Sequence, residues 1–184
     1  MAADAGFEAH AIADYVADKS RVRQGIAERV RIAVPEVKTC LIALVYGARR
    51  SAREVDAIPE VIGCQAAQRL YADPVFAALQ HDISRSRRVI LQADPTRGKQ
   101  LVNAMGLALP LPAAPTKRLA HLTQGVEAQA LRAMQAVYPD EIVLLMHDGF
   151  VSRCQLDRMQ LSRAVWKATG YEFKLSEKQL DGAV

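Results

Sequence analysis

The chain has few cysteines, no long apolar run and no internal repeat. Its three cysteines, Cys40, Cys64 and Cys154, include no CxxC pair, so the sequence predicts neither a zinc site nor a disulfide framework. No stretch has the apolar length of a membrane span, and the first residues lack the basic-then-apolar layout of a secretion signal. These absences favour a reducing compartment, and we expect a cytoplasmic protein with no membrane partner.

The composition is that of an ordinary globular protein with a small excess of positive charge. The length of 184 residues favours one domain, or one domain with a small subdomain, and is sufficient for a hydrophobic core. The net charge of +4 and the isoelectric point near 9.1 favour a polyanionic partner. Such a charge excess bears on association rather than on the fold.

Hydrophobic periodicity predicts a helix-rich α+β chain with one small antiparallel sheet near the C-terminus. Short strands are expected at 141–146 and 171–175, and the proline-rich segment 107–115 is expected to be a linker. We therefore divide the chain into a mainly helical part, 1–115, and a second part, 116–184, with a helix, a hairpin and a C-terminal helix. Helices are expected in two segments of 5–33 and at 35–53, 63–72, 74–92, 116–138 and 155–169, with Trp166 in the core.

The first candidate site is the pair His147-Asp148, which follows the predicted strand 141–146 and precedes Gly149. Glycine tolerates the backbone of a tight hairpin turn, so we expect the imidazole and the carboxylate to be exposed there. A carboxylate presented in this way is a good ligand for a hard cation such as Mg²⁺. The alternative interpretation is a chance pair on the surface.

The second candidate site is the predicted helix 35–53. Lys38 and Tyr46 differ by about 80° around the helix axis, so both can face one cleft with Ile42 between them. Arg49 and Arg53 are expected within roughly 60° of Lys38 on the same count. This face suits a nucleoside triphosphate, because an ammonium group can hold phosphate while Ile42 and Tyr46 cover a base or sugar. The alternative is a buried helix with a lysine at its mouth.

Three segments together resemble the active site of family A DNA polymerases and of phage-type single-subunit RNA polymerases. Lys38-Thr39 with Tyr46-Gly47-Ala48 resembles motif B, Gln124-Gly125 resembles the element before motif C, and His147-Asp148 resembles motif C. The three segments stand in the order that the superfamily has. The interval from motif B to motif C is close to the DNA polymerase layout, whereas the interval from Gly125 to His147 is closer to the RNA polymerase layout.

The resemblance implies a polymerase fragment, with a fingers-like part at 1–115 and a palm-like part at 116–184. It implies template-directed nucleotidyl transfer on a primer–template with nucleoside triphosphates, and two Mg²⁺ ions of which Asp148 is the one ligand identified. His147 and Asp148 would be catalytic, and Lys38, Ile42, Tyr46 and Gly47 would bind the nucleotide. The residues that would contact nucleic acid are Arg49, Arg53, His121, Gln124 and Gly125.

The sequence departs from the superfamily pattern in ways that shape the functional hypothesis. No motif A aspartate precedes motif B, and Asp4 is interpreted as part of a solvated terminus. Val34 and Gly149 stand where the superfamily usually has an arginine and an acid. We therefore expect a partial or split DNA polymerase, in which another polypeptide can supply the motif A carboxylate.

Two alternatives to a DNA polymerase stay open. One is a phage-type RNA polymerase. The other is a non-catalytic remnant that binds nucleic acid through Arg49, Arg50, Arg53 and the basic run 85–88.

Overall fold

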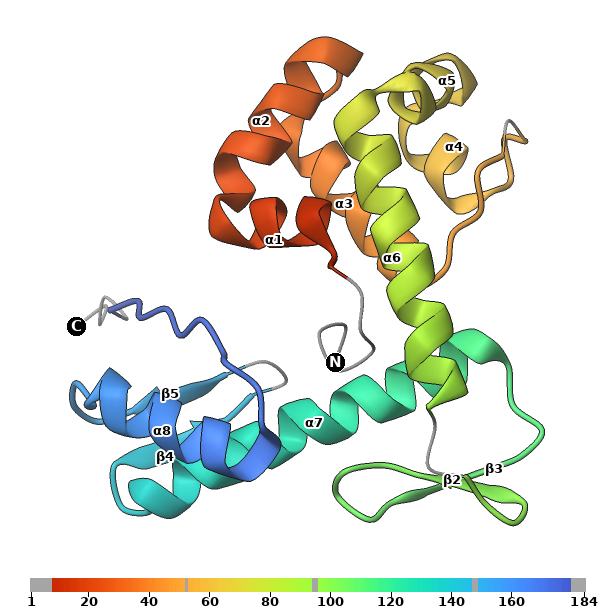
Figure 1. Cartoon of the computed structure of the whole chain (residues 1–184). Coiled ribbons are helices and arrows are strands. Elements are labelled where there is room, and N and C mark those ends of the chain that lie inside the picture. The colour runs from red at the N-terminus through yellow and green to blue at the C-terminus, as the bar shows by residue number, and fades with distance from the viewer. Residues whose placement is uncertain (1–7, 52, 94–95, 147–148, 180–184) are drawn as a thin grey trace. The chain divides into compact units, whose positions relative to one another are not determined.

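The computed structural model describes residues 8–51, 53–93, 96–146 and 149–179. Within these residues the chain has a helix-rich α+β fold with eight helices and two small antiparallel sheets (Figure 1). None of the described helices is long and apolar enough to cross a membrane. The helices are α1 (His10–Ala17), α2 (Lys19–Val30), α3 (Val34–Val45), α4 (Ala57–Ile62), α5 (Cys64–Ala72), α6 (Pro74–Gln92), α7 (Pro115–Val137) and α8 (Arg158–Thr169). The strands are β1 (Thr96–Arg97), β2 (Gln100–Val102), β3 (Ala108–Pro110), β4 (Ile142–Leu145) and β5 (Phe150–Ser152).

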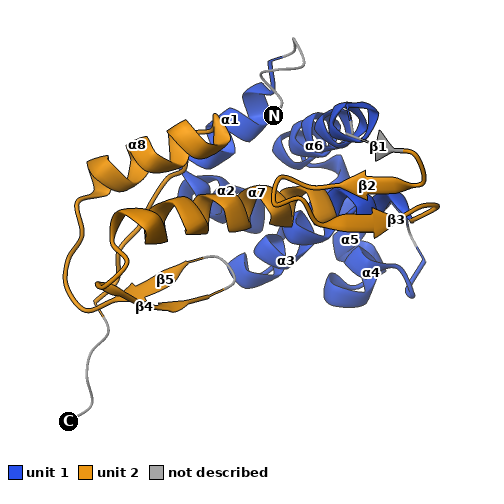
Figure 2. Cartoon of the chain, turned by 90° about the horizontal axis from the view of Figure 1, so that it is seen from below, with its two compact units in different colours: residues 1–94, 114–120 blue, residues 95–113, 121–184 orange. Residues whose placement is uncertain are grey.

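The chain forms two compact units, shown in Figure 2. Among the described residues, unit 1 comprises 8–93 and 114–120, and unit 2 comprises 96–113 and 121–179. The predicted boundary between the two parts followed residue 115, and the observed division differs from it. The segment 96–113 belongs with the second part, because its loop is hydrogen-bonded to α7 rather than being a free linker.

Unit 1 is a helical unit in which α1 to α6 pack around one apolar core. Local capping explains two of the helix starts: Asp18 accepts from Arg21 N at 2.9 Å, and Asp73 accepts from Phe76 N at 2.9 Å. Pro74 occupies the first turn of α6, where its missing N–H costs nothing. The core consists of Ile26, Ala27, Val30, Val37, Cys40, Leu41, Leu44, Ile58, Ala67, Leu70, Tyr71, Phe76 and Leu79.

The predicted extension of the α3 helix to Arg53 is wrong, because α3 ends at Val45. Gly47 has φ +98° and donates to Leu44 O at 2.9 Å, while Ala48 N donates to Ala43 O at 2.8 Å. These two bonds form a Schellman motif, which ends a helix at a glycine in a left-handed region. The glycine after the apolar run was a local stop signal for this end. Arg49 and Arg53 therefore lie in a non-helical segment and not on the face of Lys38.

Unit 2 contains the predicted hairpin. Strands β4 and β5 are antiparallel, with Leu145 opposite Phe150 and an irregularity between Ile142 and Leu144. Their base packs on α7 and α8 through a small core. The buried members of that core are Ala130, Met134, Ile142, Leu161 and Val165.

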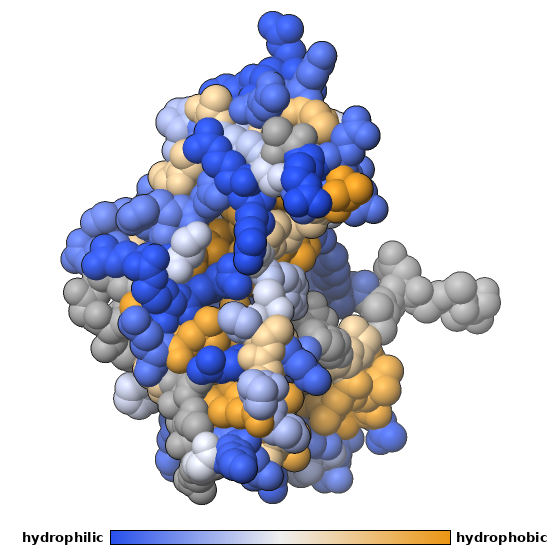
Figure 3. Space-filling view, turned by 90° about the vertical axis from the view of Figure 1, so that its right-hand side faces the viewer, coloured by the Kyte–Doolittle hydropathy of each residue, from blue (hydrophilic) through white to orange (hydrophobic). Residues whose placement is uncertain are grey.

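Three other expectations for this region are wrong. A second sheet, β1-β2-β3, occupies 96–110, and its last strand lies where the linker was expected to begin. The segment 171–175 is not a strand, and its apolar residues Phe173 and Leu175 pack against the unit 2 core instead. Trp166 is 60% exposed and is not a core residue. Figure 3 shows one face of the molecule, on which hydrophilic residues predominate and hydrophobic ones form separate patches.

Candidate functional site

Helix α3 presents three of the predicted nucleotide-binding residues on one solvent-exposed face. Lys38, Ile42 and Tyr46 are spaced by four residues, so they lie along one side of the helix and its C-cap. Lys38 is exposed, and Ile42 and Tyr46 are 46% and 52% exposed. The opposite face of the helix is buried through Val37, Cys40, Leu41 and Leu44. Residues 41–45 therefore do not all belong to the core. The ammonium group of Lys38 lies on the same face as apolar side chains that are exposed to solvent.

Gly47, the fourth predicted nucleotide-binding residue, lies against α6. A Cβ added to Gly47 would lie 2.4 Å from one terminal nitrogen of Arg87 and 2.7 Å from the other. The guanidinium of Arg87 therefore packs on the backbone of the turn that follows α3. Sequence reasoning placed Arg87 only in a basic run, because its contact with Gly47 spans 40 residues.

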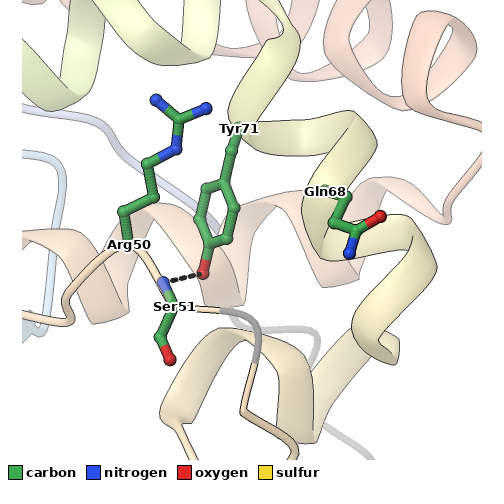
Figure 4. Close-up of a pocket in the computed structure, with 4 residues that line it drawn as sticks. All are labelled: Arg50, Ser51, Gln68 and Tyr71. Carbon is green, nitrogen blue, oxygen red and sulfur yellow. Dashed lines mark hydrogen bonds between the residues drawn. The ribbon is translucent and has the colours of Figure 1, made fainter.

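The segment after this turn carries the predicted cations and a small pocket. Arg50, Ser51, Gln68 and Tyr71 line the pocket, whose volume is about 260 Å³ (Figure 4). The Tyr71 hydroxyl accepts from Ser51 N at 3.4 Å, and the Arg50 guanidinium lies 5.6 Å from the centroid of the Tyr71 ring. Burial raises the pKa of Tyr71, so its hydroxyl stays protonated at neutral pH. Arg53 forms a long ion pair with Asp56, in which Arg53 Nε lies 3.9 Å from Asp56 Oδ2.

The predicted nucleic-acid-binding residues of unit 2 lie on α7, where two of them have structural contacts. A Cβ on Gly125 would lie 2.7 Å from Asn103 Cβ, so the glycine leaves the room that the loop between β2 and β3 needs to pack on α7. The Asn103 Oδ1 accepts from Leu107 N at 3.1 Å, and its Nδ2 donates to His121 O at 3.3 Å. The His121 ring contacts Leu107 O at 3.0 Å. Gln124 is exposed beside them.

The predicted catalytic pair, His147 and Asp148, lies outside the described residues, and so does Asp4. The segment that leads to the pair has an uncommon surface, because four successive apolar side chains, three on β4 and one after it, are 42–55% exposed. Among the residues that the structure describes, no group of three histidines, cysteines or acids is placed to hold a metal ion. The exposed residues are Val143, Leu144 and Leu145 of β4 and Met146, which follows the strand.

Comparison with protein-family models, with curated proteins and with solved structures found no match. The candidate site consequently rests on its own residues: the exposed face of α3, the turn at Gly47 with Arg87, and the cations that follow.

Proposed function

We propose that this chain takes part in template-directed nucleotidyl transfer, as a partial or split polymerase similar to family A DNA polymerases. One observation carries the proposal: the face of α3 that holds Lys38, Ile42 and Tyr46 is open to solvent. A lysine ammonium is a point charge that suits phosphate, and an exposed aliphatic and aromatic pair suits a base and its sugar. Apolar side chains on the outer face of a helix indicate a surface that something covers.

The remaining roles follow the resemblance to the polymerase motifs. Asp148, with His147 beside it, is the proposed Mg²⁺ ligand of this chain, and a second polypeptide is the proposed source of the motif A carboxylate. The primer–template is the proposed nucleic-acid partner. Its proposed contacts are Arg49, Arg53, His121, Gln124 and Gly125, of which the first two and Gln124 are exposed.

The test is an equilibrium titration of a fluorescent primer–template, with and without Mg²⁺ and the next complementary dNTP. We expect the nucleotide and Mg²⁺ together to tighten the complex. Lys38→Ala is expected to weaken this nucleotide-dependent part by about tenfold or more, because a charged hydrogen bond to phosphate is lost. The matched control is Lys19→Ala, which removes an exposed lysine from α2 and should leave the tightening intact.

Two further arms complete this test. Asp148→Asn should remove the Mg²⁺-dependent part of the tightening, because an amide carries no charge to neutralise the ion. Replacing the dNTP by the matching rNTP distinguishes a DNA polymerase from the phage-type RNA polymerase alternative. Equal behaviour of Lys38→Ala and Lys19→Ala would contradict the proposed nucleotide site.

A second candidate function is nucleic-acid binding without catalysis. The observation that favours it is the exposure of Arg49, Arg50 and Arg53 in the non-helical segment after α3, together with the net positive charge. On this alternative, affinity falls steeply with salt, because each phosphate contact releases a counterion. Binding would be indifferent to Mg²⁺, to the nucleotide and to Asp148→Asn, which separates it from the polymerase proposal in the same titration.

A further inference from the structure

The guanidinium of Arg87, from α6, lies at the end of α3, where a Cβ on residue 47 would displace it. Its guanidinium carbon lies 2.8 Å from where a Gly47 Cβ would be, and its two terminal nitrogens lie still closer. The C-terminal end of a helix favours a nearby cation, which accounts for the attraction of the guanidinium to this place. Gly47 is therefore needed twice, once for its positive φ and once for the room that Arg87 occupies.

The guanidinium has no hydrogen-bond acceptor among the residues that the structure describes. Its Nε is buried without a hydrogen-bond partner, and none of the described residues forms a hydrogen bond or an ion pair with Arg87. The carbonyls of Ala43 and Leu44 at this helix end already accept from Ala48 and Gly47. A guanidinium has five donors, and leaving donors unmet in a half-buried place costs free energy. The arrangement calls for an external acceptor.

The surroundings select a negatively charged acceptor. The stretch from Tyr46 to Ser51 contains two arginines, Arg49 and Arg50, and no acidic residue. Both of these arginines are exposed, so the turn has cations on it and on the helix that packs behind it. A planar guanidinium with free donors matches a phosphate group, which it can bind through two parallel hydrogen bonds.

We propose that Arg87, which lies against Gly47 at the end of α3, is a phosphate-binding site. The inference rests on the proposed function and adds to it a residue on α6 that belongs to none of the three motifs. The phosphate belongs either to the triphosphate of a nucleotide on α3 or to the backbone of a nucleic-acid strand. The two sources share the same chemistry, and the experiment distinguishes them.

The test compares four variants in their binding of a fluorescent twelve-nucleotide thymidylate strand over a series of salt concentrations. If the site takes a strand, Arg87→Gln should lower the slope of log affinity against log salt by about 0.7, the value for one lost phosphate contact on a single strand. Gly47→Ala should give at least the same loss without removing a charge, because its Cβ displaces the guanidinium and also strains the turn at φ +98°. The double variant should lose no more than Gly47→Ala alone. Arg132→Gln, at an exposed arginine of α7, is the control for the loss of one charge.

A second arm uses inorganic triphosphate as a competitor. If Arg87→Gln weakens the triphosphate and leaves the slope for the strand unchanged, the site takes the nucleotide. If it lowers the slope alone, the site takes the strand. Either result supports the proposal.

The proposal is overturned if Arg87→Gln binds both probes as Arg132→Gln does, even where urea denaturation shows that its stability has changed. In that case Arg87 only stabilises the end of α3. The proposed function is then still tested by whether Lys38→Ala loses the nucleotide-dependent tightening. Failure of the wild-type chain to bind either probe would contradict both proposals.

Discussion

Arg29 of α2 and Asp73, the residue that caps α6, form an ion pair in which Arg29 Nε lies 2.5 Å from Asp73 Oδ2. The Asp73 side chain is only 2% exposed, whereas that of Arg29 is 46% exposed. The other carboxylate oxygen of Asp73 accepts from Phe76 N at 2.9 Å. One buried carboxylate therefore joins two helices of unit 1 and also starts the longer of them.

The first prediction separates these two roles of Asp73. Asp73→Ala removes the cap and the ion pair together, and we expect it to lower the free energy of unfolding by about 2–4 kcal/mol. Asp73→Asn keeps a side chain that caps helices well and loses only the charge, so its effect should be smaller. Urea denaturation measures both. Equal losses in the two variants would show that the cap contributes nothing.

The second prediction concerns acid. Burial by itself raises the pKa of Asp73, but the hydrogen bonds from Arg29 and from Phe76 N outweigh it and hold this pKa below its ordinary value of 3.8. The folded-state pKa is thus lower than the unfolded one, so the stabilisation is complete well above pH 3.8 and is lost as pH falls through the folded-state value. Unfolding followed between pH 2 and pH 6 should show a shallower acid limb for Asp73→Asn than for the wild type.

The third prediction concerns the contact between Gly125 and Asn103. Gly125→Ala places a Cβ 2.7 Å from the Asn103 side chain and 3.0 Å from Ala104 N, so the loop must move. We expect a loss of about 1–3 kcal/mol in stability, in spite of the better helix propensity of alanine. Gly25→Ala in α2 is the matched control, since its Cβ would meet only one terminal nitrogen of Arg29, at 3.1 Å, and a shift of that side chain by a few tenths of an ångström relieves the contact. Thermal unfolding should rank the control at or above the wild type, and the reverse order would contradict the packing argument.

The fourth prediction distinguishes two cysteines. Burial, with a smaller contribution from Glu36, raises the pKa of the Cys40 thiol to about 11, whereas Cys154 is exposed. At pH 8 roughly one Cys40 thiol in a thousand is a thiolate, the form that reacts. Iodoacetamide labelling followed by peptide mapping should therefore modify Cys154 first and Cys40 only when unit 1 unfolds. Rapid labelling of Cys40 in the native protein would mean that α3 does not pack as described.

The fifth prediction tests the open face of α3 by stability alone. Leu41 is 5% exposed and its neighbour Ile42 is 46% exposed. Leu41→Ala should cost about 2–5 kcal/mol, because it leaves a cavity in the unit 1 core, whereas Ile42→Ala should cost well under half of that. Denaturant unfolding compares the two variants directly. A similar cost at both positions would show that the face of Ile42 is covered in the isolated chain.

The sequence by itself determined the elements whose signals are local. Helix α6 matches its predicted span, 74–92, because an aspartate cap, a proline in the first turn and apolar periodicity all lie within the segment. The end of α8 has a local signal too, because Gly170 follows the helix in the left-handed conformation that glycine favours. Gly47 was an equally local stop signal for α3, but the helix was predicted to continue to Arg53 because the arginines there suited a helix C-terminus.

Only the tertiary structure decided which side chains meet and which stay in solvent. Periodicity places Ile42 and Leu41 in one apolar run, and only the packing of α3 against its neighbours buries one and exposes the other. The same holds for Arg87 on Gly47 and for Asn103 on Gly125, which are contacts between residues far apart in the chain. A local pattern specifies backbone conformation through nearest neighbours, whereas such contacts depend on how whole elements pack together.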